Sequence, residues 1–346
     1  MKTLSCYSKE DIRIEDIPIP YIGADEILLR TIYCGLCGSD IAKIIDPEVK
    51  KPTQLGHEVI AIIEKTGSKV KKFKKGDLVC VSHHIPCFDC VYCDHLNFSM
   101  CRHFRETNLD PQGFTEYIRL SEEHVKYNTF LIDYTKYLKN AIFIEPVACC
   151  LRAVEKNNLK KGDKVVVIGC GTIGIIFISL FKFLYNAKVT AVDIDNNKLE
   201  YARKFGADLT INSKAEDLKE KISTITDTGF DVIELTYITK ETVNVAMRLV
   251  RAGGSIQVFA GPSKERRIEI DFEDFYKREI TLFSSYSSST DVCKKSFNLL
   301  RDGKIDFTKL ISKILPIEDF KTGLALALSQ KYFKIIFYFN ENFKNF

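Results

Sequence analysis

The chain is 346 residues long, with 45% hydrophobic residues, 28% charged residues and a formal net charge of +4. At roughly 100–200 residues per domain, this length predicts two domains, each large enough to bury its own core. Eighteen Gly and nine Pro residues are ordinary numbers, and they exclude collagen-like and broadly disordered chains. The basic residues are dispersed, so no nucleic-acid partner is expected.

No apolar stretch reaches the ~18 residues of a membrane helix, and no membrane partner is expected. The chain starts with residues that run straight into charged positions and lack the apolar segment of a secretory signal. We therefore expect a soluble, cytoplasmic protein. Its twelve cysteines are many for such a chain. In a reducing compartment they indicate metal binding or catalysis before disulfides.

Residues 1–145 are predicted to be rich in strands, because short β-branched runs alternate there with Gly-containing turns. These strands are expected at 26–33, 58–65 and 77–81. From about residue 147 strands alternate with helices, which is typical of a parallel sheet covered on both faces. Here strands are expected at 164–169, 187–193, 230–236, 255–260 and 280–286, helices at 172–185, 196–205 and 241–250, and a last strand at 334–339.

A glycine-rich turn follows the strand at 164–169 and opens the next helix, in the order Gly169-Cys170-Gly171-Thr172-Ile173-Gly174. The first glycine permits the tight turn, the second lets backbone approach a pyrophosphate, and the third lets the helix pack on the strand. The free N–H groups at the start of the helix favour phosphate.

Asp193 lies nineteen residues beyond Gly174, at the end of the next strand. A carboxylate there accepts hydrogen bonds from ribose hydroxyls and repels a 2′-phosphate, so NAD is favoured over NADP as the cofactor. The alternative is a structural glycine turn with an aspartate that caps a helix. Besides the motif glycines and Asp193, the predicted cofactor-binding residues are Thr172, Ile173, Lys198, Phe259, Ala260 and Ser285.

Four cysteines lie on one short segment as C-x2-C-x2-C-x7-C, namely Cys87, Cys90, Cys93 and Cys101. Four thiolates can close a tetrahedron around Zn²⁺ with no open position, which is the structural type of zinc site. The segment has little aliphatic content, so the metal would supply folding energy. An iron–sulfur cluster is the rival, but the spacing before the last cysteine differs from the ferredoxin pattern.

A second set of metal-ligating residue types is spread along the chain. Cys37 is followed by Ser39 and Asp40, then His57 and Glu58 come about twenty residues later, and Glu145 precedes the second half of the chain. A thiolate, an imidazole and one or two carboxylates would hold a zinc with one position left for substrate. Taken singly, each residue also has an ordinary structural role open to it.

The order of these motifs resembles the zinc-dependent medium-chain dehydrogenase/reductase family, most closely its polyol (sorbitol) and threonine dehydrogenase branch. The motifs on which this resemblance rests are G-x-C-G-S-D at 35–40, G-H-E at 56–58, the four-Cys lobe, E-P at 145–146 and G-x-G-x-x-G at 169–174. The resemblance implies an α/β plus β fold, in which a doubly wound Rossmann domain (147–285) is inserted into a GroES-like catalytic domain. That domain would comprise 1–146, with the structural zinc lobe at 87–101, and 286–346.

The resemblance also implies roles for individual residues. Cys37 and His57 would be ligands of a catalytic zinc, with Glu58 and Glu145 as further ligands, direct or through water. Asp40 would orient His57, although a simple turn cap is the alternative for it. Ser39 would hydrogen-bond the substrate alcohol. Two Zn²⁺ ions per chain and a homodimer or homotetramer follow from the same resemblance.

The sequence departs from the family in two places. Ala42 stands where many relatives have a histidine that relays the proton to bulk water. The segment between Cys37 and His57 is about five residues shorter than in typical polyol dehydrogenases, which would open the substrate pocket to a bulkier or phosphorylated polyol. Lys43, Lys50 or Lys51 could then contact a phosphate.

The sequence thus predicts an NAD-dependent zinc oxidoreductase that transfers a hydride from a secondary alcohol (a polyol, a sugar alcohol or its phosphate) and leaves a ketone. L-threonine and simple secondary alcohols are alternative substrates. The rivals of other kinds are a non-catalytic NAD(H)-binding sensor or structural protein, and a zinc-free quinone or enoyl reductase. The cysteines outside the two motifs are predicted to be small core residues.

Overall fold

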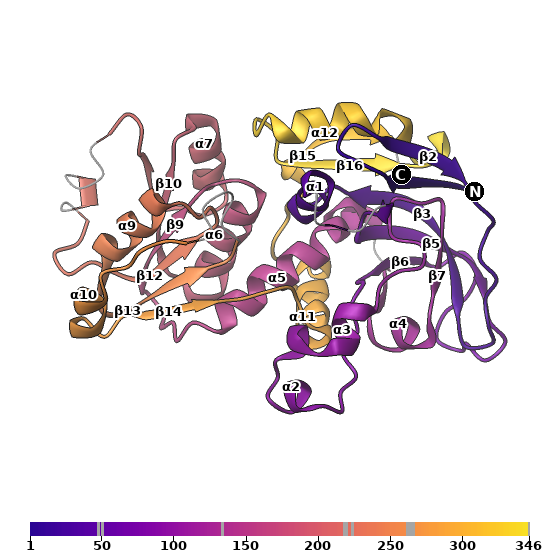
Figure 1. Cartoon of the computed structure of the whole chain (residues 1–346), viewed down its shortest axis with the longest axis horizontal. Coiled ribbons are helices and arrows are strands. Elements are labelled where there is room, and N and C mark those ends of the chain that lie inside the picture. Colours follow the sequence, from indigo (N-terminus) through magenta and orange to yellow (C-terminus); the bar gives the residue numbers. More distant parts are fainter. Residues whose placement is uncertain are drawn as a thin grey trace. The chain divides into compact units, whose positions relative to one another are not determined.

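The computed structural model describes residues 1–46, 49, 52–132, 135–216, 221–222, 225–260 and 267–344. It divides into two compact units (Figure 1). The first combines Met1–Ala148 with Ser288–Phe346, and the second is Cys149–Ser287.

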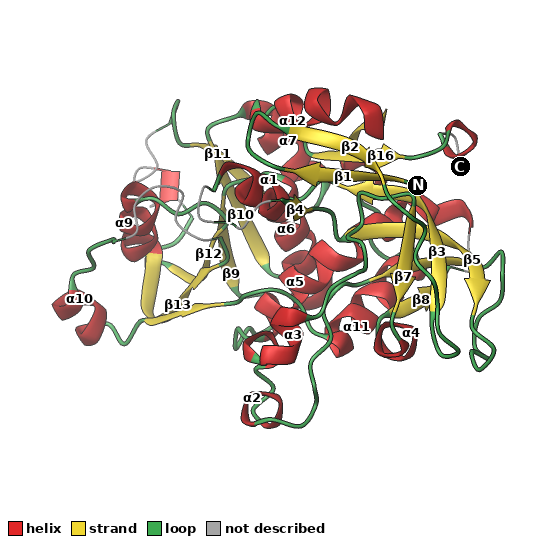
Figure 2. Cartoon of the chain, turned by 45° about the vertical axis from the view of Figure 1, so that its right-hand side comes forward, coloured by secondary structure: helices red, strands yellow, loops and turns green. Residues whose placement is uncertain are grey.

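The first unit is built on a mixed sheet whose strands come from both ends of the chain (Figure 2). Its order is β15 (Ile311–Pro316), β16 (Lys334–Tyr338), β3 (Ile27–Gly35), β5 (Glu58–Thr66), β6 (Leu78–Val81) and β8 (Thr129–Leu131), and β7 (Tyr117–Leu120) also pairs with β3. A small sheet joins β2 (Ile12–Asp16), β1 (Lys2–Cys6) and β4 (Thr53–Gln54). One core of aliphatic and aromatic side chains joins these strands to α12 (Phe320–Leu328).

Pairing within this sheet brings distant residues together. Strand β3 pairs antiparallel with β5, so that Gly35 lies opposite Glu58. On its other side β3 pairs antiparallel with β16, where Gly35 lies opposite Ile336. The C-terminal strand is therefore adjacent to the turn that leads from Gly35 into α1 (Gly38–Ile45).

Most of the remaining helices of the first unit are short. The cysteine-rich lobe consists of α2 (Val91–Asp94), η1 (Phe98–Met100) and α3 (Arg102–Glu106), and it projects from the rest of its unit in both views (Figures 1 and 2). The others are α4 (Glu122–Tyr127), η2 (Thr135–Phe143), α11 (Thr290–Arg301), η3 (Thr308–Leu310), η4 (Ile317–Asp319) and η5 (Glu341–Phe343). Helix α5 (Ile144–Glu155) runs from the first unit into the second.

The second unit is a parallel six-stranded sheet in the order β11-β10-β9-β12-β13-β14 (Figure 1). The strands are β9 (Lys164–Ile168), β10 (Lys188–Asp193), β11 (Leu209–Asn212), β12 (Phe230–Leu235), β13 (Val250–Val258) and β14 (Thr281–Ser284). They alternate with α6 (Thr172–Tyr185), α7 (Asn196–Lys204), α9 (Lys240–Leu249) and α10 (Phe272–Lys277). Alternation of this kind is what places helices over both faces of a parallel sheet.

The expected α/β plus β fold with a doubly wound parallel sheet is confirmed. The predicted helix at 172–185 matches α6, and most predicted strands agree with the structure within two residues. The strand predicted at 255–260 is wrong at its start, because β13 begins at Val250 and passes through Gly253 and Gly254, which interrupt the apolar run. In the described part of the chain, no helix combines the length and the hydrophobicity needed to span a membrane.

Candidate zinc and cofactor sites

The four thiols of the cysteine-rich lobe converge on one point. The Sγ atoms of Cys90 and Cys93 are 3.6 Å apart, those of Cys87 and Cys93 3.9 Å, and those of Cys87 and Cys101 3.5 Å. Zinc–sulfur bonds of 2.3 Å arranged as a tetrahedron give edges of about 3.8 Å. None of these cysteines forms a disulfide. The residues therefore fit a structural zinc ion.

The lobe has little else to hold it together. Its buried cluster contains two of the cysteines and Phe104, with Phe98 and Cys90 packed beside it. Backbone N–H groups of Cys87 and Asp89 donate to cysteine sulfurs at 3.4 Å, which favours thiolates. A segment with so small an apolar core depends on the metal for its fold.

A second convergence lies where β3 turns into α1. The ligand atoms of Cys37, His57 and Glu58 all lie within 4.8 Å of one another. Cys37 caps the start of α1, while His57 and Glu58 enter β5 and are buried. A thiolate, an imidazole and a carboxylate form a donor set suited to zinc. Glu145 is buried at the start of α5, but it does not join this group of three.

Asp40 connects the two segments that supply these ligands. Its Oδ1 accepts a hydrogen bond from the Gly56 N–H at 2.9 Å and lies 3.5 Å from His57 Nδ1, while its Oδ2 accepts from the Cys37 N–H. Asp40 thus caps α1 and faces the imidazole at the same time. The other ring nitrogen of His57, Nε2, faces away from Asp40 and lies 3.5 Å from Ser39 Oγ.

The charges of this group shift its pKa values strongly. Burial lowers the pKa of His57, but Asp40 and Cys37 outweigh burial and leave that pKa well above its usual value. Burial raises the pKa of Asp40, yet His57 and the Gly56 N–H bring it below its usual value. In the metal-free protein the cluster therefore favours an aspartate paired with an imidazolium, and zinc binding must displace that proton.

Gly56 determines where His57 enters the site. Its φ of +91° belongs to a region that other residues seldom adopt. A Cβ atom there would lie 2.7 Å from the backbone nitrogen of Phe114 and 2.8 Å from Cys34 Sγ. Only glycine fits this position, and the backbone next to His57 is held by the N–H groups of Gly113 and Phe114, which donate to the carbonyls of Gly56 and Leu55 at 2.8 and 3.0 Å.

Lys334 is a member of this site that the sequence analysis did not single out. Its Nζ donates to both carboxylate oxygens of Glu58, at 2.7 and 2.8 Å, and both side chains are buried. Burial lowers the pKa of Lys334, but Glu58 and Cys37 raise it above its usual value. The available signal was a lone lysine at the head of an otherwise apolar strand.

His83 is a second residue that sequence reasoning did not place here. Its ring centroid lies 4.7 Å from that of His57 and 3.9 Å from that of His84. Burial holds the pKa of His83 well below its usual value, so the ring is neutral. Its Nδ1 is buried and has no hydrogen-bond partner among the described residues. A neutral imidazole with a buried, unpartnered nitrogen thus lies against the candidate metal ligand His57.

The glycine turn of the second unit has the geometry of a phosphate-binding loop. Gly169 has a φ of +94°, and a Cβ at Gly174 would lie 1.9 Å from the Gly169 carbonyl oxygen. Gly171 is the N-cap of α6 and faces open space. Thr172 and Ile173 form the first turn of that helix, where N–H groups are free. The loop fits a dinucleotide pyrophosphate.

Asp193 lies at the end of β10, beside this loop. Its Oδ2 accepts from the Cys170 N–H at 2.7 Å, and its Oδ1 accepts from the Asp195 N–H at 2.9 Å. Each oxygen keeps a lone pair, so the carboxylate can still accept ribose hydroxyls. Lys198 on α7 is close enough to act electrostatically on Cys170. The structure thus brings Asp193 and Lys198 to the predicted cofactor loop.

The other predicted cofactor residues follow the neighbouring strands. Phe259 and Ala260 come directly after β13, and Ser285 comes directly after β14. Because the strands are parallel, these residues lie at the same sheet edge as Gly169. Phe259 packs edge-on against Phe177 of α6, with ring centroids 4.9 Å apart. Ser285 is buried, and its hydroxyl has no partner among the described residues.

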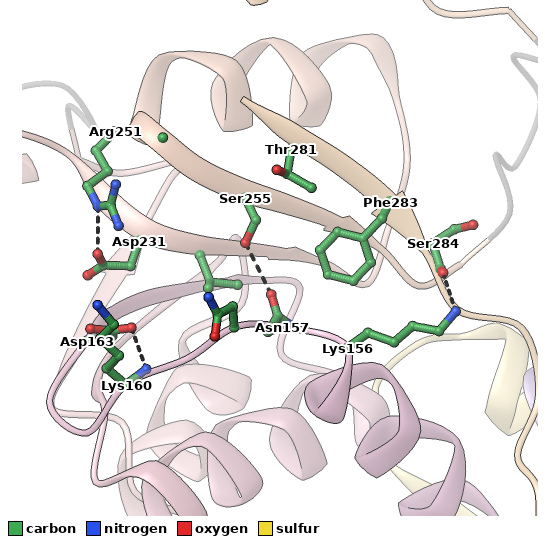
Figure 3. A pocket seen from close by; sticks show the side chains of 13 residues that line it. Lys156, Asn157, Lys160, Asp163, Asp231, Arg251, Ser255, Thr281, Phe283 and Ser284 are labelled. Carbon is green, nitrogen blue, oxygen red and sulfur yellow. Dashed lines mark hydrogen bonds and ion pairs between the residues drawn. The ribbon is translucent and has the colours of Figure 1, made fainter. Parts of the chain in front are cut away.

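A hollow of about 720 Å³ lies on the second unit, near the amino ends of β12 and β13 (Figure 3). Its polar groups pair with one another: Arg251 with Asp231 at 2.6 Å, Ser255 with Asn157 at 3.2 Å, and Lys156 with the Ser284 carbonyl at 3.0 Å. The glycine turn lies at the carboxyl end of β9, so this hollow is separate from the predicted cofactor site.

Two positions at which the sequence analysis noted a departure from the family, or a consequence of one, lie on α1. Ala42 is exposed on α1, and Lys43 beside it is half-buried. Lys50 and Lys51, the other candidates for a phosphate contact, lie outside the described residues.

Of the cysteines predicted to be core residues, all but the half-buried Cys149 are buried.

Comparison with known proteins decides the family. The "Alcohol dehydrogenase GroES-like domain" model matches residues 23–128, and the "Zinc-binding dehydrogenase" model matches residues 172–302. The chain belongs to the zinc-dependent medium-chain dehydrogenase/reductase family. Sorbitol dehydrogenase of Bacillus subtilis (strain 168) is 29% identical to this dehydrogenase over 339 residues, which cover 96% of the chain and 94% of that relative.

Two solved structures share its fold over almost their whole length. Galactitol-1-phosphate dehydrogenase from Escherichia coli is 26% identical, with a TM-score of 0.84 and coverage of 98% of this chain and 100% of that one. A zinc-binding dehydrogenase from Sinorhizobium meliloti 1021, bound to NADP, is 25% identical, with a TM-score of 0.86 and coverage of 97% and 98%. The predicted family and its polyol-dehydrogenase-like branch are thus confirmed, and the chain is a zinc-dependent alcohol oxidoreductase.

Proposed function

We propose that this dehydrogenase transfers a hydride from a secondary alcohol of a polyol, sugar alcohol or sugar-alcohol phosphate to NAD⁺, leaving a ketone. The observation that carries the proposal is the convergence of Cys37, His57 and Glu58, with Ser39 beside the imidazole. A non-catalytic binding protein would have no use for this donor set or for a hydroxyl next to it.

Two zinc ions belong to the proposal, one held by the four-Cys lobe and one held by Cys37 and His57, with Glu58 and Glu145 as further candidates. The second ion would supply a Lewis acid that lowers the pKa of an alcohol. Ser39 would accept the alcohol's hydrogen bond and relay the proton, passing its own hydroxyl proton on to water. Asp40 would fix the tautomer of His57 and keep Nε2 toward the metal, because Nδ1 faces the carboxylate.

NAD is the proposed cofactor because of Asp193. Its carboxylate lies beside the glycine loop, where a 2′-phosphate would meet a negative charge. The relative from Sinorhizobium meliloti is bound to NADP, so both coenzymes belong in the assay. Lys198 on α7, which acts electrostatically on Cys170 of the loop, would contact the ribose or its phosphates.

The polyol assignment is supported by the named relatives, a sorbitol dehydrogenase and a galactitol-1-phosphate dehydrogenase. Lys43 is proposed as a contact for a substrate phosphate, since it lies one turn into α1, close enough to Asp40 to act on it electrostatically. Threonine is the second candidate substrate, and simple secondary alcohols are the third.

The test is a screen for NAD⁺ and NADP⁺ reduction with polyols, their phosphates, L-threonine and simple secondary alcohols. We expect the highest kcat/KM for a polyol or its phosphate with NAD⁺. Preference for threonine would revise the substrate, whereas no reduction of either coenzyme with any of these alcohols would contradict the proposal.

The proposal assigns catalysis to the first unit and coenzyme binding to the second, and variants of the first unit test this assignment. Cys37→Ser and His57→Ala should abolish turnover and leave NADH binding, followed by the fluorescence of bound NADH, within about threefold of wild type. Loss of NADH binding in these variants would contradict the assigned roles.

A further inference from the structure

Two cations from the end of one helix hold the segment that follows β14. Arg152 of α5 donates from Nη1 to the Tyr286 carbonyl oxygen at 2.6 Å and to that of Ser287 at 3.4 Å. Lys156, one helical turn further on, donates to the Ser284 carbonyl oxygen at 3.0 Å (Figure 3). Within the described residues, the Tyr286 and Ser287 carbonyls have no other donor. Two like charges thus converge on one short piece of backbone.

This arrangement is unfavourable in two respects. Arg152 is only 8% exposed, and burial of a charged group costs free energy that its hydrogen bonds must offset. Ser287 has a φ of +63°, a region that residues other than glycine seldom adopt. The backbone at Ser287 therefore keeps its conformation only because neighbouring groups hold it, and Arg152 is one of them.

The end of the helix that carries Arg152 is fixed to the sheet. Gln257 of β13 is fully buried; its Nε2 donates to the Ala153 carbonyl oxygen at 2.8 Å, and its Oε1 accepts from Asn157 Nδ2 at 2.9 Å. Ser255 Oγ, also on β13, donates to Asn157 Oδ1 at 3.2 Å. Because Arg152 adjoins Ala153, it holds the segment after β14 at a fixed place relative to β13.

The segment lies where the second half of a dinucleotide is expected. In a doubly wound sheet, a dinucleotide crosses the carboxyl ends of the strands at the point where the strand order reverses. That point lies between β9 and β12. With the adenosine ribose at Asp193 of β10 and the pyrophosphate at the Gly169 loop after β9, the nicotinamide half would extend over β12, β13 and β14. Residues 285–287 follow β14 directly.

We propose that Arg152 is a positioning residue for the nicotinamide half of the coenzyme, because it fixes the backbone of residues 285–287 beside the place of the nicotinamide ring. The inference rests on the proposed function, since it concerns the coenzyme of that reaction. Arg152 acts through the segment that it holds and does not itself touch the coenzyme. Its removal should therefore weaken binding of the nicotinamide half and leave binding of the adenosine half unchanged.

The experiment compares two ligands that differ in the nicotinamide ring. Isothermal titration calorimetry on the zinc-loaded protein gives the Kd of NADH and the Kd of ADP-ribose, which lacks that ring. In Arg152→Met, we expect the Kd of NADH to rise at least tenfold and the Kd of ADP-ribose to change by less than twofold. A tenfold change corresponds to about 1.4 kcal/mol, roughly the contribution of one hydrogen bond to a charged group.

Arg278 supplies a matched control in the same unit. Its Nη1 donates to the Met247 carbonyl oxygen at 2.8 Å, and its Nη2 donates to that of Val250, at the amino end of β13. Arg278→Met also removes a guanidinium group from two backbone carbonyls, but at the opposite edge of the sheet. We expect it to lower the Tm and to leave both Kd values within twofold of wild type.

Two further variants keep the result decisive. Arg152→Lys retains a charge that can reach one of the two carbonyls, so its Kd for NADH should lie between those of wild type and Arg152→Met. If Arg152→Met does not fold, Arg152→Gln takes its place. The amide of that variant can donate one hydrogen bond, so we expect a rise in the Kd of NADH of at least threefold, again with ADP-ribose binding unchanged.

The outcomes separate this inference from the proposed function. Wild-type protein that reduces neither coenzyme with any alcohol of the screen would overturn the proposed function. In an active wild type, equal weakening of NADH and ADP-ribose by Arg152→Met, or weakening of neither, would overturn this inference alone. The same selective loss of NADH binding in Arg278→Met would also overturn it. If the screen shows NADP⁺ to be the coenzyme, NADPH and 2′-phospho-ADP-ribose form the corresponding pair of ligands.

Discussion

Glu234 offers a sharp test of the electrostatics inside the parallel sheet. It lies on the central strand β12, between Val167 of β9 and Gln257 of β13, and is fully buried. Neither of its carboxyl oxygens has a hydrogen-bond partner within the described residues. Burial raises the pKa of Glu234 well above its usual value, so the folded protein holds this group protonated.

The consequence for stability follows from proton linkage. Above the pKa of an ordinary glutamate, the unfolded chain releases the proton and the folded chain keeps it. The free energy of unfolding therefore falls by about 1.4 kcal/mol per pH unit until the pH reaches the folded pKa of Glu234. The fall ends where the pH passes the folded pKa, and beyond that point the difference between wild type and Glu234→Gln should stay constant. Glu234→Gln has no proton to lose and lacks this slope.

The assay is urea unfolding of wild type and Glu234→Gln, followed by far-UV circular dichroism because the chain has no tryptophan. Other titrating groups are shared and cancel in the difference between the two free energies. Glu200→Gln is the control: Lys204 lowers the pKa of the exposed Glu200, which is ionised in both states, so its difference should not vary with pH. A pH-independent difference for Glu234→Gln would refute the assignment of a neutral buried carboxyl.

Three further predictions concern the four-Cys lobe, the Cys37 site and the cofactor loop. Cys90→Ser should lower the zinc content from two ions to one per chain and lower the Tm, as measured by atomic absorption and calorimetry; two retained ions would contradict the lobe site. Gly76 has a φ of +92° and open space around it, so Gly76→Ala serves as a control and should lower the free energy of unfolding by about 1–2 kcal/mol. Gly56 has a similar φ but two close neighbours, so Gly56→Ala should lower the free energy of unfolding by about 1–3 kcal/mol more than Gly76→Ala and should reduce zinc binding. Equal losses of stability in urea unfolding would contradict the expected clash with these neighbours. Asp193→Asn should raise the NADP⁺/NAD⁺ ratio of kcat/KM about tenfold, since about 1.4 kcal/mol of charge repulsion corresponds to that factor; an unchanged ratio would remove Asp193 from the coenzyme choice.

The sequence predicts best what depends on local pattern. Helix α6 and the strands β9, β10 and β12 follow from their apolar runs, and the glycine loop follows from spacing. The pairing of β16 with β3 could not be predicted, because the two strands are some 300 residues apart and nothing local specifies the partner. The early start of β13 was missed since its glycines resemble a turn.

For the metal site, residue type and motif order were enough to name Cys37, His57 and Glu58 as neighbours. They were insufficient for Lys334 and His83, whose roles depend on long-range packing. A lysine at the head of an apolar strand is usually solvated, and only the register across Gly35 shows that this one is buried against a carboxylate. Glu145 shows the reverse: its motif matches the family, yet it does not join the group of three.

The central claim is that a metal held by Cys37 and His57 lowers the pKa of the alcohol's hydroxyl, so that the resulting alkoxide can give up hydride. The most direct measurement is stepwise removal of zinc with dipicolinate, with activity and bound zinc determined on the same samples. We predict that activity falls in proportion to the first ion lost and returns when one equivalent of zinc is added back, while the ion of the four-Cys lobe stays bound. Full activity in protein that has lost the Cys37 zinc would contradict the account.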